Sequence, residues 1–201
     1  MNTQSKTTRL ALMGLLTAVL LLMAYTPLGY LNIGPLAITF NVIPVALAAI
    51  TLGPVGGAAM GAVFGITSFL QCMGIGGTSA MGVILFEISP VLAFIQRFVP
   101  RVLAGLLTGC IHLGARKLAG NTVAGFAAGF SGAFLNTLLF MTGLIVLFGN
   151  TEYLQGLIGG RNVIVFICAF VGVNAVVEMV VSTLITGILG KALHKAHLIG
   201  G

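Results

Sequence analysis

Apolar residues run through the chain in long blocks, each close to the length that crosses a lipid bilayer and separated from the next by Gly, Pro or charged residues. Such blocks predict membrane-spanning helices, because a bilayer offers no water to satisfy the backbone groups of an irregular segment. We predict an all-α integral membrane protein in which one six-helix bundle forms a single domain over residues 1–201. The predicted spans are about 9–26, 37–52, 54–71, 89–115, 122–148 and 161–192.

The composition of two of the longer connections between the spans predicts their structure. Residues 26–36 contain Pro and Gly breaks and predict a loop between the first two spans. Residues 71–87 interleave glycines with apolar residues, which predicts an irregular segment folded back on the protein that could act as a lid. Small residues at every fourth position, Gly57–Gly61–Gly65 and Gly125–Gly129–Ala133, predict close contacts between helices.

The composition excludes several classes of protein. Only 6% of the residues are charged while 58% are hydrophobic, which leaves too little polar side chain to cover a soluble domain. A nucleic-acid-binding protein or a disordered region needs more charge. The three cysteines are far apart, so they form neither a disulfide scaffold nor a metal site. We therefore expect a lipid membrane around the chain, no nucleic-acid partner and no bound metal.

The basic residues predict the orientation, because Lys and Arg gather in cytoplasmic loops. Six spans place both termini on one side, where we find Lys6, Arg9, Arg116, Lys117, Lys191 and Lys195. The loops on the opposite side carry one basic residue, Arg161, and one acidic residue, Glu152. Both termini are therefore predicted to be cytoplasmic, and only Arg97 and Arg101 remain unexplained, inside the fourth span.

A charged side chain within a membrane costs roughly 2.5–3.5 kcal/mol on insertion scales, so each one needs a partner or a function. For Arg101 we predict a structural ion pair with Glu178 of the sixth span. Arg97 shares the face of Arg101 and has either Glu87 or an anionic ligand as its counter-charge. The polar residues of spans and loops that could bind a substrate together with Arg97 are Asn136, Gln71, Tyr30, Asn174 and Asn41.

No hydrolase or nucleotide-binding motif occurs in the sequence. We therefore predict that the chain is not an enzyme and uses no cofactor.

The order of several sequence runs is similar to that of a known family. The runs are ALMGLLTAVLLLMAYTPLGYLNIGPLAITFNVIPVALAAITLGPVGGAAMGAVFG, RFVPRVLAGLLTG, SGAFLNTLLF and VNAVVEMVVSTLITGIL. Together they resemble the substrate-binding S components of energy-coupling-factor (ECF) vitamin transporters, and the likeness covers nearly the whole chain.

The resemblance implies a subunit of a prokaryotic cell-membrane importer that binds a vitamin with high affinity on the outside. Its implied partners are a transmembrane coupling subunit and two cytoplasmic ATPase subunits, which hydrolyse the ATP. Such S components contact the coupling subunit through an Ala-x-x-x-Ala pattern on the first helix. Here the matching positions are Gly14 and Ala18, one methyl group short of that pattern.

The resemblance is closest to the branch with pantothenate, folate and pyridoxine S components. It implies a ligand site near the outer face, where Arg97 and Asn136 fall. An arginine there favours a carboxylate, so pantothenate is the expected substrate. The alternatives are an S component for pyridoxine, folate or riboflavin, and, from a different class, a small homo-oligomeric anion channel with Arg97 and Arg101 in a ring.

Overall fold

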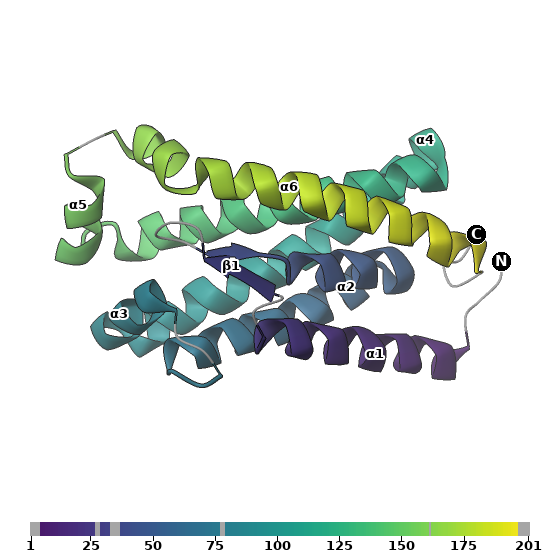
Figure 1. The fold of residues 1–201 in the computed structure, drawn as a ribbon, viewed down its shortest axis with the longest axis horizontal. Coiled ribbons are helices and arrows are strands. Elements are labelled where there is room, and N and C mark those ends of the chain that lie inside the picture. The colour runs from purple at the N-terminus through teal and green to yellow at the C-terminus, as the bar shows by residue number, and fades with distance from the viewer. Residues whose placement is uncertain (1–4, 27–28, 33–36, 77–78, 161, 197–201) are drawn as a thin grey trace.

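The computed structural model describes residues 5–26, 29–32, 37–76, 79–160 and 162–196, and helices make up most of them. The elements follow in the order α1 (Lys6–Ala24), β1 (Tyr30–Asn32), β2 (Ala37–Thr39), α2 (Val42–Cys72), α3 (Ala80–Ile88), α4 (Pro90–Phe148), α5 (Glu152–Ile158) and α6 (Val163–Lys195). The long helices lie side by side along the molecule (Figure 1). The two strands form an antiparallel hairpin in which Tyr30 pairs with Thr39.

Among the described residues, four helices are long and apolar enough to cross a membrane. They are Lys6–Ala24, Val42–Cys72, Pro90–Phe148 and the Val171–Lys195 part of α6. The prediction of a helical membrane protein with several spans is confirmed, while the count of six spans and their orientation stay predictions.

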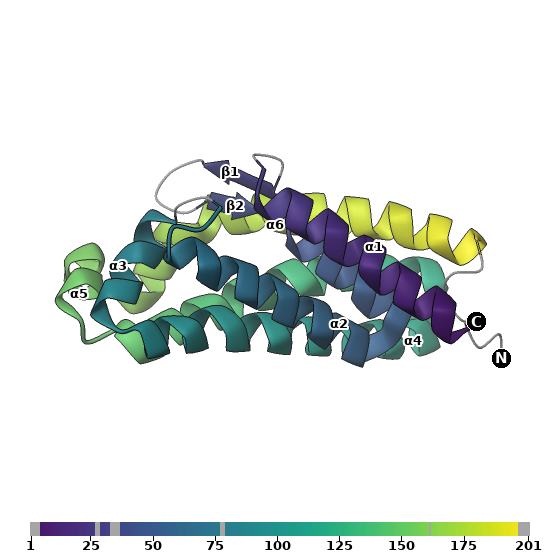
Figure 2. The same cartoon turned by 90° about the horizontal axis from the view of Figure 1, so that it is seen from below.

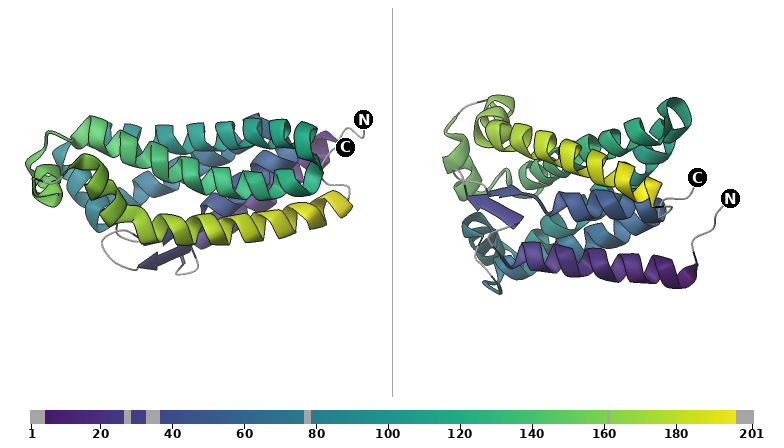
Figure 3. Two further views of the ribbon diagram at one scale, coloured as in Figure 1. Left: turned by 90° about the horizontal axis from the view of Figure 1, so that it is seen from above. Right: turned by 45° about the vertical axis from the view of Figure 1, so that its right-hand side comes forward.

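A glycine interrupts the helical backbone within each of α2 and α4. Gly53 has φ 80° and ψ −172°, and Gly120 has φ 82° and ψ 174°, conformations that other residues rarely adopt. After Gly53 the chain turns back, since Gly57 lies beside the side chain of Ala49. After Gly120 it turns back again, and Nδ1 of His112 lies 3.2 Å from the carbonyl oxygen of Ala124. Each of α2 and α4 is therefore two antiparallel helices, and the halves of α4 lie side by side in Figure 3.

Glycine lets the second half of α2 approach α4 closely. A Cβ atom on Gly57 would overlap the carbonyl oxygen of Gly105, and one on Gly61 would overlap that of Arg101. In the second predicted stripe, a Cβ atom on Gly129 would lie 2.8 Å from Cα of Thr183 in α6. Both stripes therefore pack within this chain, as close packing in a membrane requires.

The start of the second predicted span is wrong by five residues. Ala37–Thr39 form β2, and the helix begins only at Val42. Ile38 and Thr39 are β-branched, which favours a strand. The backbone N–H of Asn41 also donates to Oγ1 of Thr39 at 3.3 Å, a local bond that competes with helix formation.

The segment 71–87 is less irregular than predicted, because it contains most of α3. Ser79 starts this helix as its N-cap, and its side chain accepts a hydrogen bond from the backbone N of Gly82 at 3.2 Å. The short helix α5 was not predicted either. It begins after the N-cap Thr151 and ends at Ile158, where the C-cap Gly159 has a left-handed backbone conformation with φ 60°.

The two ends of the bundle differ. The start of α1 and the end of α6 lie at one end, and α3 and α5 lie at the other (Figure 1). The hairpin lies on the side of the bundle beside α1 and α6 (Figure 2), where β2 contacts α6. Below, the end with α3 and α5 is called the α3–α5 end.

Candidate functional site

Two buried arginines on one face of α4 form the centre of the candidate site. Arg97 is 6% exposed and Arg101 is 5% exposed. Their guanidinium carbons lie 5.1 and 4.3 Å from the centre of the Phe140 ring, and that of Arg101 also lies 5.2 Å from the Phe64 ring. Contact with ring faces partly stabilises the charge of a guanidinium. The two arginines therefore lie on one buried face of α4, beside the same aromatic ring.

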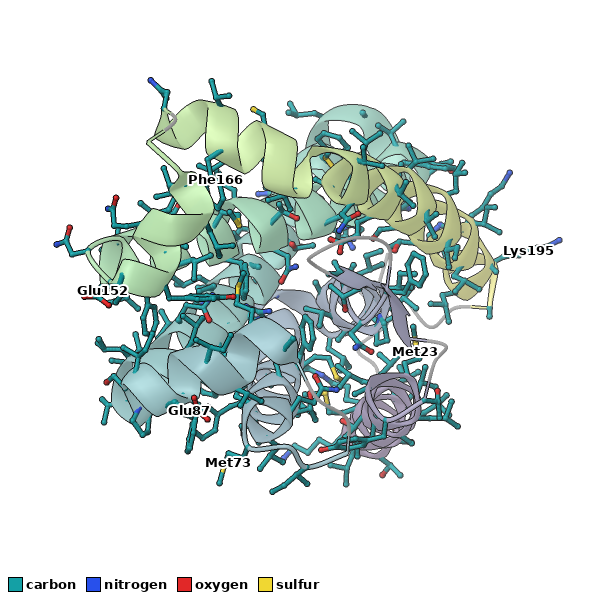
Figure 4. The ribbon with its side chains drawn as sticks, turned by 60° about the vertical axis from the view of Figure 1, so that its left-hand side comes forward. Met23, Met73, Glu87, Glu152, Phe166 and Lys195 are labelled. Carbon is teal, nitrogen blue, oxygen red and sulfur yellow. The ribbon has the colours of Figure 1, made fainter. Side chains whose placement is uncertain are left out.

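Arg97 reaches toward α3. Its Nη2 donates a hydrogen bond to Oγ of Ser79 at 3.3 Å, and its Nε has no partner among the described atoms. Glu87, one predicted counter-charge, is exposed on α3 and forms no ion pair with Arg97 in the described part of the chain. Glu87 and Glu152 both lie on the outside of the α3–α5 end (Figure 4).

Glu178 connects α6 to the hairpin and to α4. It is 6% exposed, and its Oε1 accepts a hydrogen bond of 2.6 Å from the backbone N of Thr39. Its Oε2 accepts one of 3.5 Å from Oγ1 of Thr137. The ion pair between Glu178 and Arg101 stays a prediction.

Asn41 and Asn136 lie where polar ligand groups could be bound. Asn41 precedes α2 and is fully buried, yet neither Oδ1 nor Nδ2 of its side chain has a described partner. Buried amides are nearly always hydrogen-bonded, so we expect the side-chain amide of Asn41 to bind a ligand or a water molecule. Asn136 is buried on the second half of α4.

A small cavity of about 10 Å³ lies beside Asn136. It has room for one water molecule. It is lined by Val42, Val45, Phe64, Arg101, Ala104, Thr108, Gly132 and Asn136.

The remaining predicted residues are in different situations. Gln71 is buried at the end of α2, where its Nε2 donates to the carbonyl oxygen of Ala24 at 2.7 Å and thereby holds α1. Asn174 is buried on α6, one turn before Glu178. Tyr30 lies in β1, and its side chain is outside what the structure describes.

Comparison with known proteins identifies the family. The family model for the substrate-specific component of ECF transporters matches residues 8–190. The chain belongs to this family. It is thus a multi-pass cell-membrane protein and the substrate-binding component of a transporter rather than an enzyme.

Two relatives align with the S component over nearly its full length. The pantothenic acid transporter PanT of Lactococcus lactis subsp. cremoris is 26% identical over 210 residues, which cover 96% of this chain and 97% of the relative. The pantothenate transporter PanT of Leuconostoc mesenteroides subsp. mesenteroides is 28% identical over 204 residues, which cover 94% of this chain and 93% of the relative.

The two residues predicted to contact the coupling subunit lie on the exposed surface of α1. Gly14 and Ala18 are exposed on α1, and no neighbouring atom lies within 4 Å of a Cβ placed on Gly14.

Two polar residues beside Arg97 were missed by the sequence analysis. Gln96 is fully buried; its Nε2 donates to the carbonyl oxygen of Phe140 at 3.5 Å, and its Oε1 has no described partner. A glutamine within an apolar span, next to an arginine, was the available signal. For Ser79 the sequence could indicate only a helix N-cap. Its contact with Arg97 depends on how α3 folds back on α4 and could not be predicted.

Proposed function

We propose that this S component binds pantothenate at the α3–α5 end of the bundle and passes it to an ATP-driven import complex. The observation that carries the proposal is Arg97, a buried cation with no acidic partner among the described residues. A buried arginine of this kind fits a ligand with a carboxylate. The names of both relatives support the same substrate.

In this proposal Arg97 binds the carboxylate of pantothenate. Hydrogen bonds to its amide and hydroxyl groups come from the buried side chains of Asn41, Asn136, Asn174 and Gln71 and from Tyr30 of β1. Asn41 is the strongest of these candidates, because both polar atoms of its buried amide have no described partner. Glu178 and Arg101 act structurally as an ion pair, and the S component needs no cofactor.

The proposed arrangement in the membrane has six spans with both termini in the cytoplasm. The reversals at Gly53 and Gly120 support the count, since each divides one long helix into two antiparallel ones. The cytoplasmic end then holds Lys6, Arg9, Arg116, Lys117, Lys191 and Lys195, in agreement with the positive-inside rule. Arg161, the basic residue predicted for the opposite side, lies outside the described residues.

The proposed partners are a membrane coupling subunit and two cytoplasmic ATPase subunits. The exposed surface of α1 around Gly14 and Ala18 is proposed to contact the coupling subunit, because two small residues one turn apart allow another helix to approach closely.

Thermal stability in detergent tests the proposed substrate, because a ligand that binds only the folded state raises the melting temperature. We expect a saturable increase with pantothenate and none with pyridoxine, folate, riboflavin, thiamine or biotin. A saturable increase with one of the other vitamins and none with pantothenate would contradict the proposed substrate but not the family.

A further inference from the structure

The first turn of α3 lies directly against the guanidinium of Arg97. Oγ of Ser79 accepts hydrogen bonds from Nη2 of Arg97 at 3.3 Å and from the backbone N of Gly82 at 3.2 Å. Gly82 permits this approach, since a Cβ atom there would lie 3.0 Å from Nη2 of Arg97 and 2.7 Å from Sγ of Cys72. Any side chain at position 82 would have to displace Sγ of Cys72 and Cβ of Ser79, and it would also crowd the guanidinium.

Two positive features therefore meet at this point. The N-terminus of a helix carries a partial positive charge. In α3 the first backbone bond runs from N of Val83 to the carbonyl oxygen of Ser79, so the N–H groups of Ala80 and Met81 have no partner within the helix. The other feature is Arg97, 6% exposed, whose Nε has no partner among the described atoms.

The other contacts of Arg97 do not neutralise its charge. Among the described residues they are the hydroxyl of Ser79 and the ring of Phe140, neither of which is an anion. A buried cation beside the positive end of a helix is unfavourable until an anion joins them. The arrangement therefore fits the binding of a negatively charged group better than an empty state.

We propose that Arg97 and the first turn of α3, organised by Ser79, form the subsite that receives the carboxylate of the substrate. One carboxylate oxygen would accept from the guanidinium of Arg97, and the other from the N–H groups of Ala80 and Met81, which have no partner within the helix. Ser79 is then a positioning residue, because its hydroxyl holds the guanidinium at the helix terminus. The inference rests on the proposed function. It adds the first turn of α3 as the element that binds the carboxylate together with Arg97.

Ser79→Asp tests the subsite without any ligand. Asp is as good an N-cap as Ser, so α3 keeps its start, while the new carboxylate takes the place proposed for the substrate. We expect the melting temperature of the ligand-free variant to rise by about 2–4 °C, the shift typical of one extra favourable interaction in a chain of this size. A melting temperature below that of the wild type would overturn the subsite.

Ser89→Asp is the matched control. Ser89 is the N-cap of α4, where its side chain accepts from the backbone N of Leu92 at 3.4 Å, as Ser79 does in α3. It lies eight residues before Arg97, about 12 Å along the helix. The same change of charge and cap should therefore leave both stability and binding close to those of the wild type.

Calorimetric titration with two ligands tests the role of the carboxylate. The ligands are pantothenate and pantothenol, in which a CH2OH group replaces the carboxylate. We expect the wild type to bind pantothenate about 10- to 100-fold more tightly than pantothenol, as charge-assisted hydrogen bonds predict. Ser79→Asp should lose this preference, because its own carboxylate occupies the subsite, and should bind pantothenol as the wild type does.

The outcomes separate the subsite from the proposed function. If Ser79→Asp binds pantothenate as tightly as the wild type, the subsite is wrong and pantothenate remains the substrate. If wild-type protein binds neither compound, the proposed substrate is wrong, and the stability of ligand-free Ser79→Asp still decides whether an anion subsite exists.

Discussion

The carboxylate of Glu178, within α6, accepts a hydrogen bond of 2.6 Å from the backbone N–H of Thr39 in β2. A charged acceptor buried to this degree holds the hairpin on the bundle with more than the strength of a neutral hydrogen bond. The two residues are 139 positions apart, so the bond connects the early part of the chain to its last helix.

Glu178→Ala should therefore loosen the hairpin. We expect the free energy of unfolding to fall by about 1.5–3 kcal/mol, the range for a hydrogen bond to a charged group. Hydrogen–deuterium exchange should increase in peptides that contain Thr39 and Phe40 while exchange in α4 stays slow. Glu87→Ala removes an exposed acid and serves as the control. Unchanged exchange at Thr39 in the Glu178→Ala protein would contradict this role.

Glu178→Gln tests the predicted ion pair with Arg101. Glutamine keeps an oxygen that can accept from Thr39 but has no charge, so the loss in stability reports mainly the missing charge. A double-mutant cycle with Arg101→Gln should give a coupling of about 0.5–3 kcal/mol in thermal or chemical unfolding. Pantothenate affinity should change less than stability. Additive effects of the two substitutions would exclude the pair.

The contact between Gly57 and Gly105 predicts that neither position tolerates a methyl group. A Cβ atom on either residue would overlap the carbonyl oxygen of the other, so α2 and α4 would have to separate. We expect Gly57→Ala to cost about 1–3 kcal/mol of stability, as overpacked cores do. The control is Gly114→Ala on α4, where a Cβ atom would have no neighbour within 4 Å. A lower melting temperature only in Gly57→Ala supports the contact.

Sequence reasoning located the parts of the fold that depend on the membrane. Long apolar runs are required wherever a helix meets lipid, so the main helices were predicted, although the second span was predicted to begin too early. The reversal at Gly53 was readable because Pro54 follows it. The short elements were missed for a physical reason. In a chain that is apolar almost throughout, β2 and α3 have no polar face to mark their period. The helix α5 has Glu152 and Gln155 on one side, but it is only seven residues long, too short to show a clear period.

The candidate site was predicted in the same uneven way. Arg97 and Arg101 were readable because a charge in an apolar run needs an explanation and positions four apart share a helix face. The contact between Arg97 and Ser79 was not readable, since it depends on α3 folding back over α4. Binding of substrate by Gln71 stays a prediction, and its bond to the carbonyl oxygen of Ala24, which holds α1, was not predicted.

Arg97→Ala should affect binding far more than folding. The substitution removes a buried charge that has no acidic partner in the described chain, so we expect stability to stay the same or to increase slightly. Affinity for pantothenate should fall by about 10- to 100-fold in calorimetric titration, as expected for the loss of a charge-assisted hydrogen bond. Lys117→Ala, an exposed charge on the same helix, is the control. Unchanged affinity in Arg97→Ala would remove this residue from the site.

Gly14→Trp should separate binding from assembly. Gly14 is exposed on α1 and no atom lies within 4 Å of a Cβ placed there, so an indole ring should not disturb the fold. On the proposed docking surface it would keep another helix from approaching, because close packing in a membrane needs small residues. Co-purification with the coupling subunit should be lost, while pantothenate affinity in detergent stays at the wild-type value. Leu15→Trp, one position along and 61% exposed, points about 100° away around the helix and should still assemble. Normal assembly of Gly14→Trp would place the docking surface elsewhere.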